Sequence, residues 1–340
     1  MMLLSPMTIK QTTFKNRVVM SPMCMYSVEK QDGVATEFHY NHYVTRAVGG
    51  VGYIMIESTA VLPNGRISYE DLGLWDDSQI EPLKRIVNEV HKYGAKIGIQ
   101  LSHAGRKSRT KDIVSSSPIQ FSSRYAVPKM LSIEEIKDIV KAFGEAARRA
   151  NEAGFDSIEL HGAHGYLINQ FISDLTNTRE DIYKDGTLFL KEVIDEVSKN
   201  FPKEKILQIR VSGYEYHQLG LTPYDWASIL NNFKHQLDLV NVSSGGTVEA
   251  TIDDYPGYQL PYARIIKEET HMLVLGGGQL DDEVLAEEAL KHGDIDMVYF
   301  GRKLLKDPYF IYKLDESLLP KQYVRATSLK KRLNEGRKTL

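Results

Sequence analysis

Eight short apolar runs alternate with longer amphipathic segments along almost the whole chain, and this alternation constrains the fold more than any other feature. Most of the runs lack polar–apolar alternation, as is typical of strands buried on both faces. Eight strands, each followed by a helix, predict an α/β fold, a single (β/α)8 TIM barrel. The alternative is a doubly wound sheet, which usually has fewer strands and a Gly-x-Gly-x-x-Gly turn that is absent after the first strand here. The runs cover residues 17–20, 53–56, 96–101, 157–160, 206–211, 238–242, 272–275 and 297–300.

The segments between these runs carry helix start and stop signals. The clearest helix begins at Ser132, where Glu135 three residues later completes a capping box, and ends at Gly154. A second predicted helix covers residues 281–292 and is closed by Gly293. The Ser-rich stretch 114–123 interrupts the alternation, and we expect it to pass over the mouth of the barrel.

Length and charge limit the classes of protein to consider. We expect a barrel over residues 1–325, because α/β barrels reach this length as one domain, and a basic tail over 326–340. The formal net charge of −3 provides no general positive field for nucleic acid or an anionic membrane. The single Cys24 excludes an intramolecular disulfide and a four-cysteine metal site. The N-terminal residues lack the pattern of a signal peptide, so we expect a cytoplasmic enzyme.

Three polar side chains follow the fourth apolar run, where a barrel has its active site. His161, His164 and Tyr166 come together at the end of this predicted strand, between glycines. Imidazoles donate hydrogen bonds to a substrate oxygen, and a phenol donates a proton. The plainer interpretation is a histidine pair that caps a helix or is satisfied in the core, but glycines on both sides let a ligand approach the backbone and favour a site. A metal site is a third interpretation. The metal site is the weaker interpretation, because no nearby carboxylate or cysteine completes a ligand set.

Glycine-rich turns follow the last two predicted strands. Residues 276–278 are three glycines, and Gly301-Arg302 follows the eighth strand. Turns after strands seven and eight are where barrels bind phosphate through exposed backbone amides. The glycine triplet alone would indicate only a tight turn, but the pair of turns with an arginine favours a phosphate site.

Five motifs make the chain similar to a known family. They lie at residues 15–26, 100–106, 161–167, 255–259 and 301–302. With them the chain resembles the Old Yellow Enzyme family of flavin-dependent ene-reductases, and within it the small bacterial thermophilic-like class described as NADPH dehydrogenases. The resemblance implies FMN as cofactor, with NADPH as reductant. It places the following residues around FMN: Ser21, Pro22, Met23 and Cys24 along the isoalloxazine, Ser58 and Gln100 on the pyrimidine side, Arg210 at the N1/O2 edge, and Gly277, Gly278, Gly301 and Arg302 at the phosphate.

The resemblance also implies roles toward the substrate. His161 and His164 would hold the carbonyl oxygen, Tyr26 would pack over the substrate, and Tyr166 would supply the proton. Arg325 would reach the active site of a neighbouring subunit in a homodimer or homotetramer. Small molecules are therefore the expected partners, without nucleic acid or membrane.

One loop departs from the family pattern. After the fourth strand the family usually carries Tyr-Gly-Gly-Ser and then Glu-Asn-Arg, whereas residues 183–190 here read Tyr-Lys-Asp-Gly-Thr-Leu-Phe-Leu. Asn177, Arg179 and Asp181 survive upstream. Because the lost residues mostly brace this loop, we expect the flavin site to persist.

Three functions remain open on the sequence. The first is an FMN-dependent NAD(P)H oxidoreductase that reduces the activated C=C bond of α,β-unsaturated carbonyl compounds, and also quinones or nitro compounds. The second is a phosphate-binding barrel without flavin, acting as an isomerase or aldolase. The third is a flavin-binding protein with little turnover. Cys24, Gln100 and Arg210 favour the first, because the second leaves them unexplained.

Overall fold

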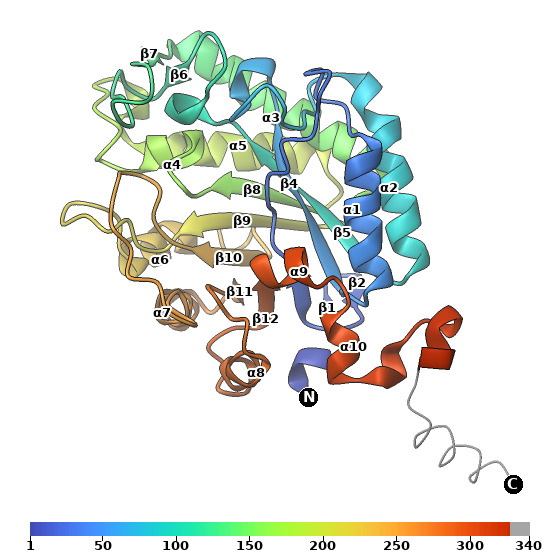
Figure 1. The fold of residues 1–340 in the computed structure, drawn as a ribbon. Coiled ribbons are helices and arrows are strands. Elements are labelled where there is room, and N and C mark those ends of the chain that lie inside the picture. Colours follow the sequence, from blue (N-terminus) through green and yellow to red (C-terminus); the bar gives the residue numbers. More distant parts are fainter. Residues whose placement is uncertain (327–340) are drawn as a thin grey trace, which may run out of the picture.

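The computed structural model describes residues 1–326, and eight parallel strands in it form a closed barrel (Figure 1). All eight predicted strands are present, and their bounds agree with the prediction to within two residues, except that β4 runs four residues further, to Ala60. The barrel closes where Val298 of the last strand pairs with Val18 of the first. In barrel order the strands are β3 (Val18–Met20), β4 (Tyr53–Ala60), β5 (Lys96–Ser102), β8 (Ser157–Gly162), β9 (Ile206–Ser212), β10 (Leu239–Ser243), β11 (Leu273–Gly276) and β12 (Met297–Phe300).

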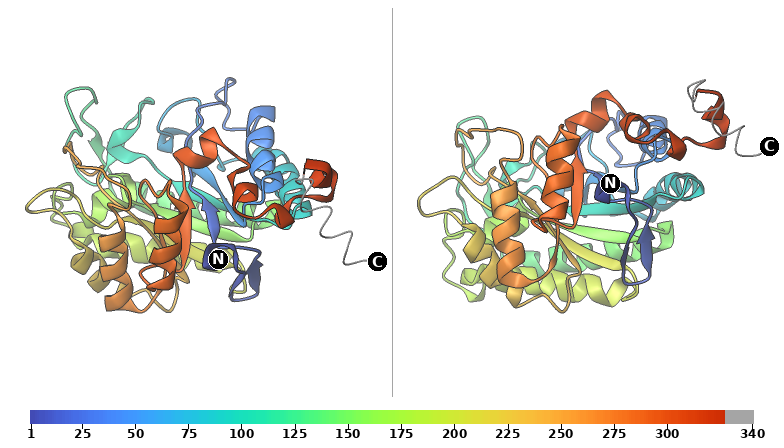
Figure 2. Two further views of the ribbon diagram at one scale, coloured as in Figure 1. Left: turned by 60° about the horizontal axis from the view of Figure 1, so that its bottom comes forward. Right: turned by 90° about the horizontal axis from the view of Figure 1, so that it is seen from below.

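Helices surround the barrel on its outside, as the three views show (Figure 2). The predicted barrel is therefore confirmed. The helices are α1 (Glu37–Val48), α2 (Ile80–Lys92), α3 (Ile133–Ala153), α4 (Leu167–Ile172), α5 (Gly186–Asn200), α6 (Pro223–Asn231), α7 (Leu260–Thr270), α8 (Glu283–Lys291), α9 (Arg302–Lys306) and α10 (Phe310–Leu314). None of the helices within residues 1–326 combines the length and the apolar character that crossing a membrane requires.

Local capping explains where α3 and α8 begin. Ser132 Oγ accepts from the Glu135 amide at 3.2 Å, Glu135 returns the bond to the Ser132 amide at 2.8 Å, and α3 ends at Gly154 with φ of 91°. The capping box therefore forms as predicted. Helix α8 begins two residues after the predicted start, because the side chain of Asp282 accepts the free amide of Val284.

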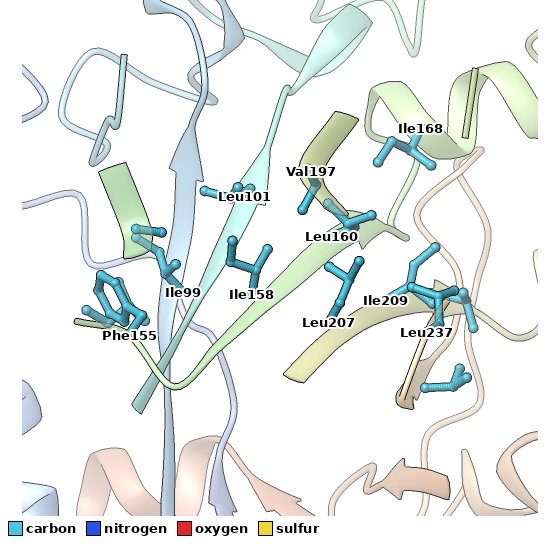
Figure 3. Packing of buried hydrophobic residues seen from close by; sticks show 14 of the residues in the cluster. Ile99, Leu101, Phe155, Ile158, Leu160, Ile168, Val197, Leu207, Ile209 and Leu237 are labelled. Atoms are coloured by element: carbon cyan, nitrogen blue, oxygen red, sulfur yellow. The ribbon is translucent and has the colours of Figure 1, made fainter. Parts of the chain in front are cut away.

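The main hydrophobic core lies between the barrel and the helices. Ile99 and Leu101 of β5 and Leu160 of β8 are fully buried and point outward from the strands into this layer, near Ile168 of α4 and Val197 of α5 (Figure 3). Because side chains alternate along a strand, the residues between them face the inside of the barrel.

The inside of the barrel is closed at its N-terminal end. The hairpin of β1 (Met7–Ile9) and β2 (Thr12–Phe14) places Phe14 against Tyr53 of β4, with ring centroids 4.8 Å apart. Met55 and Met297 belong to the same small apolar cluster. The barrel is therefore open only toward the C-terminal ends of its strands.

The expected excursion leaves the barrel after β5. Its short strands β6 (Val114–Ser115) and β7 (Lys129–Met130) pair in parallel, beside the loop that follows β5 (Figure 1). At the other end of the chain, α10 leads to a 3₁₀ segment, Lys321–Ala326. The predicted tail lies almost wholly outside the described residues.

Candidate active site

The three aromatic residues predicted after the fourth run come together at the end of β8. The ring centroids of His161 and His164 are 5.1 Å apart, and those of His161 and Tyr166 are 4.7 Å apart. His164 and Gly165 both have positive φ, 59° and 68°, which turns the chain sharply after the strand. The turn brings Tyr166 back against His161.

Hydrogen bonds fix the donor atoms of the two imidazoles. The Ala163 amide donates to His161 Nδ1 at 3.3 Å, so the ring hydrogen of neutral His161 is on Nε2. His164 Nε2 lies 2.8 Å from Ser243 Oγ, which itself accepts from Gln259 Nε2 at 3.3 Å. Ser243 can therefore give its own hydrogen to His164 Nε2, which leaves Nδ1–H as the free donor of His164.

The protonation states suit hydrogen-bond donation by neutral groups. Burial, together with the positive charges of Arg210 and Lys107, lowers the pKa of His161 and of His164 well below the usual value. Burial raises the pKa of Tyr166 well above the usual value of a phenol. At neutral pH the cluster therefore presents two uncharged imidazoles and one protonated phenol.

Lys107, which the sequence analysis did not assign, holds this cluster from the loop after β5. Its ammonium donates to the backbone carbonyls of His164 at 2.9 Å and Gly246 at 3.0 Å, and lies 5.4 Å from the centroid of the Tyr166 ring. Burial, with help from Arg106, lowers the pKa of Lys107 to about 8. One cation thus joins the loops that follow β5, β8 and β10.

Cys24 and Tyr26 lie in the loop after β3. Tyr26 is 52% exposed and has φ of 50°, so its ring can border the mouth of the barrel. The buried carboxylate of Glu57 accepts the neighbouring Met25 amide at 3.1 Å. Burial and the negative charges of Asp71 and Glu57 raise the pKa of the Cys24 thiol, which therefore stays protonated.

A cavity of about 230 Å³ opens between the ends of β3 and β12 and the turn after β11, and one of its lining residues is Ser243, the hydrogen-bond partner of His164. Gly278 and Gly301 line it, whereas Gly277 packs against the ring of Tyr299, where a Cβ would lie 2.3 Å from the ring. Arg302 is the first residue of α9 and its side chain is exposed. The lining residues are Ser21, Met23, Arg210, Ser243, Tyr258, Gln259, Gly278, Gln279, Leu280, Asp281, Tyr299, Phe300, Gly301 and Arg302.

The residues around this cavity fit FMN. The side-chain Nε of Arg210 is buried and has no hydrogen-bond partner among the described residues, so an acceptor is missing next to it. An anionic flavin edge would supply this acceptor. At the far end, backbone without side chains at Gly278 and Gly301, together with Arg302, suits a phosphate. Ser58, which follows an irregularity in β4, and Gln100 are both buried and pair with each other on neighbouring strands, but neither lines the cavity.

The loop that departs from the family pattern is well braced. Asn177 Nδ2 donates to the carbonyls of Phe171 at 2.7 Å and Tyr183 at 2.9 Å. The guanidinium of Arg179 donates to Asp181 and to the carbonyl of Leu131 at 2.7 Å. The three upstream residues noted in the sequence therefore hold this loop without the lost ones.

Several residues of the site were missed by the sequence analysis. Ser243 and Tyr299 had no assigned role, although Ser243 directly follows the predicted strand over residues 238–242. The acidic Glu159 within an apolar strand was a signal that could have been noticed. Arg325, by contrast, is exposed on the 3₁₀ segment and takes no part in the contacts described above.

A (β/α)8 barrel with a buried arginine Nε that lacks an acceptor, a glycine-rich turn beside Arg302 and a histidine pair at one mouth is the arrangement expected of an FMN-binding oxidoreductase. The chain belongs to the NADH:flavin oxidoreductase / NADH oxidase family, which matches residues 2–321. It is 47% identical over 311 residues to an NADPH dehydrogenase of Clostridium acetobutylicum, covering 89% of this chain and 91% of that protein. The predicted family, enzyme class and FMN cofactor are thereby confirmed.

Solved structures show the same fold. An Old Yellow Enzyme homologue from Zymomonas mobilis is 26% identical, with a TM-score of 0.80, and covers 93% of this chain and 92% of its own. A 2-naphthoyl-CoA reductase superimposes with a TM-score of 0.86 over 93% of this chain at 23% identity, and the chain spans 52% of that protein's length. The family leaves the flavin-free isomerase or aldolase without support.

Proposed function

We propose that this FMN-dependent NAD(P)H oxidoreductase uses NADPH to reduce the activated C=C bond of α,β-unsaturated carbonyl compounds. The observation that carries the proposal is the cluster of His161, His164 and Tyr166. Two neutral N–H donors lie beside one protonated phenol, which suits a substrate that needs its oxygen polarised and a carbon protonated. Quinones and nitro compounds also offer an oxygen to such a pair.

The proposed FMN-binding set extends from the cavity to the end of β5. Bound FMN supplies the hydride chemistry that links NADPH to the substrate. The guanidinium of Arg210 would pair with the anionic edge of FMN, and the turn after β11 together with Gly301 would hold its phosphate. The full proposed set is Ser21, Pro22, Met23, Cys24, Ser58, Gln100, Arg210, Gly277, Gly278, Gly301 and Arg302.

The side chains around the substrate polarise its carbonyl group, protonate its α-carbon and cover the molecule. His161 Nε2–H and His164 Nδ1–H donate to the carbonyl oxygen, and stabilise the negative charge that develops on it. The hydroxyl of Tyr166 donates a proton to the α-carbon. Tyr26, half exposed at the mouth, covers the substrate and limits its contact with water.

The decisive experiment follows the colour of the purified protein without oxygen. Yellow protein should be bleached by NADPH under nitrogen, and cyclohexenone should restore the colour within the time of turnover. Bleaching without recovery by any enone, quinone or nitro compound would support the flavin-binding protein with little turnover. Protein that takes up no flavin would contradict the cofactor.

We also propose that the enzyme is a homodimer or homotetramer. The support is the segment from Tyr309, at the start of α10, to Ala326, which we call the C-terminal arm. An apolar hollow of about 480 Å³ in it is lined by Tyr309, Tyr312, Leu319 and Tyr323, and Arg325 is exposed beyond it. Tyr309 and Tyr323 pack with ring centroids 6.4 Å apart, so the two ends of the arm are in contact. The cytoplasmic location stays a prediction.

A further inference from the structure

A buried carboxylate that takes no part in the proposed chemistry lies at the centre of the barrel. Glu159 of β8 is fully buried, and its two oxygens accept from three side-chain amides. Gln100 Nε2 donates to Oε1 at 2.7 Å, while Gln208 Nε2 and Asn241 Nδ2 donate to Oε2 at 2.5 and 2.9 Å. Among the described residues, no lysine, arginine or histidine forms an ion pair with Glu159.

The position of Glu159 is directly below the active site. Glu159 pairs with Gln100 on one side and with Gln208 on the other. Two residues further along the same strands, His161 pairs with Arg210. Because alternate residues of a strand face the same side, the Glu159 layer lies one step inside the layer that carries the histidine and the arginine.

A carboxylate accepts hydrogen bonds and cannot donate them, so it dictates the orientation of every amide around it. Gln100, Gln208 and Asn241 must all turn their NH₂ groups toward Glu159. Asn241 does so although its carbonyl oxygen is then buried without a partner. Gln208 can place its carbonyl oxygen on Tyr53, which donates to it at 2.9 Å.

The carbonyl oxygen of Gln100 remains available to accept a hydrogen bond from a ligand. This oxygen forms no hydrogen bond with any described residue. It is nevertheless not one of the fully buried polar atoms without a partner within residues 1–326, so it is not completely enclosed by protein. The N-terminal end of the barrel is filled by the cluster around Phe14 and Tyr53. Gln100 Oε1 is therefore directed toward the open end, where FMN is proposed to bind.

We propose that Glu159 is a positioning residue for FMN: it holds the Gln100 amide so that its carbonyl oxygen accepts the single N–H of the flavin pyrimidine ring. The inference rests on the binding of FMN at this mouth. A barrel brace alone would not need a buried charge, since well-packed apolar residues replace such groups at little cost and often with a gain in stability. The carboxylate also places a negative charge below the flavin, which opposes its reduction.

The test compares Glu159→Gln with Glu287→Gln. Glu287 is a matched control, because it is a buried carboxylate that accepts the amides of Met2 and Leu3 outside the barrel. In Glu159→Gln, three amides compete for one carbonyl oxygen, so Gln100 is free to turn its NH₂ toward the flavin N–H. We expect the Kd of the apoprotein for FMN, measured by fluorescence titration, to rise about tenfold, as for one unsatisfied buried polar group.

Two further readouts separate positioning from general weakening of the fold. The N3–H resonance of ¹⁵N-labelled FMN should move in Glu159→Gln, and the midpoint potential of bound FMN should become more positive. Neither should change in Glu287→Gln. In a Gln100→Leu background, Glu159→Gln should add almost nothing to the Kd, because the group through which it acts is gone.

Other results would overturn the proposal. If Glu159→Gln lowers only the Tm and leaves the N3–H resonance unchanged, Glu159 is a structural brace. The same conclusion follows if its effect on the Kd adds fully to the effect of Gln100→Leu. Wild-type apoprotein that fails to bind FMN would instead contradict the proposed cofactor site. If Glu159→Gln does not fold, as judged by circular dichroism, Glu159→Leu with Gln208→Leu removes the acceptor without an unpaired charge, and the same readouts decide.

Discussion

Lys107 donates a hydrogen bond to the backbone carbonyl of His164 at 2.9 Å, although 57 residues separate the two in the chain. His164 is held in a left-handed backbone conformation, which costs a residue with a side chain about 1–2 kcal/mol. The lysine thus stabilises a turn on which the position of the imidazole depends.

Lys107→Met should keep the packing and lose this restraint. We expect kcat/KM for an enone to fall about tenfold, because a hydrogen bond from a charged group is worth about 1.5–3 kcal/mol. Lys205→Met is the control. Lys205 is also partly buried and donates a hydrogen bond to Asn151 at 2.9 Å, but it lies just before β9, at the opposite end of the strands from the active site. Steady-state kinetics of both variants give the comparison. Equal kcat/KM in wild type and Lys107→Met would show that the turn holds itself.

Tyr166→Phe should retain FMN and substrate but lose the proton donor. Reoxidation of the reduced enzyme by an enone, followed by stopped flow, should slow by about 10²–10⁴-fold. Reduction by NADPH serves as the internal control and should be almost unaffected. An unaltered reoxidation rate would mean that water or another group donates the proton.

His164→Ala should abolish the binding of phenols above the flavin. A phenol such as p-hydroxybenzaldehyde should produce a long-wavelength charge-transfer band in the wild type, because two N–H donors stabilise the phenolate. The band should disappear in the variant while FMN stays bound. Stoichiometric zinc in the pure protein, with activity lost to a chelator, would favour a metal site instead.

Asp71 gives a prediction about pH and stability. Burial, opposed by bonds from the amides of Ile67 and Ser68, raises its pKa to about 6. Between the unfolded pKa of about 4 and the folded value, the folded state holds more protons, so this group lowers the free energy of unfolding as pH rises through that window. The free energy of unfolding of Asp71→Asn, relative to that of the wild type, should therefore rise by about 1 kcal/mol between pH 5 and pH 7.5. Urea unfolding at both pH values measures this, and a difference that does not depend on pH would contradict it.

Arg325→Ala tests the proposed role of the C-terminal arm. If the arginine enters a neighbouring active site, the KM for substrate should rise severalfold, while the Kd for FMN and the mass in solution stay the same. Light scattering should give a dimer or tetramer at working concentration. A monomeric mass, or a KM equal to that of the wild type, would count against a contribution from a second subunit.

The barrel was predictable because its signals are local. Buried strands read as apolar runs, and the ends of α3 follow from Ser132 and Gly154, whose cap hydrogen bonds lie within a few residues. The aromatic cluster was predictable for the same reason, since His161 and Tyr166 are close in sequence. Gly277 shows the limit: only its packing on Tyr299 distinguishes it from the neighbouring Gly278.

The role of Lys107 could not be predicted by the same means, and Glu159 gave only the signal of an acidic residue within a predicted strand. The partners of Lys107 are backbone carbonyls of two distant loops, which leave no mark on side-chain patterns. The proposed role of Glu159 depends on side-chain amides from three other strands, β5, β9 and β10. Such contacts exist only after the barrel has closed.

The pairing of β12 with β3 joins the two ends of the barrel sequence, Val298 beside Val18. As the chain emerges from the ribosome, β3 therefore has an unpaired edge until almost all of the barrel has been synthesised. Contacts between such distant residues are slow to form, because the loop entropy is lost before the contact is gained. We expect refolding to be limited by this last closure, with partly closed barrels as the species most prone to aggregate.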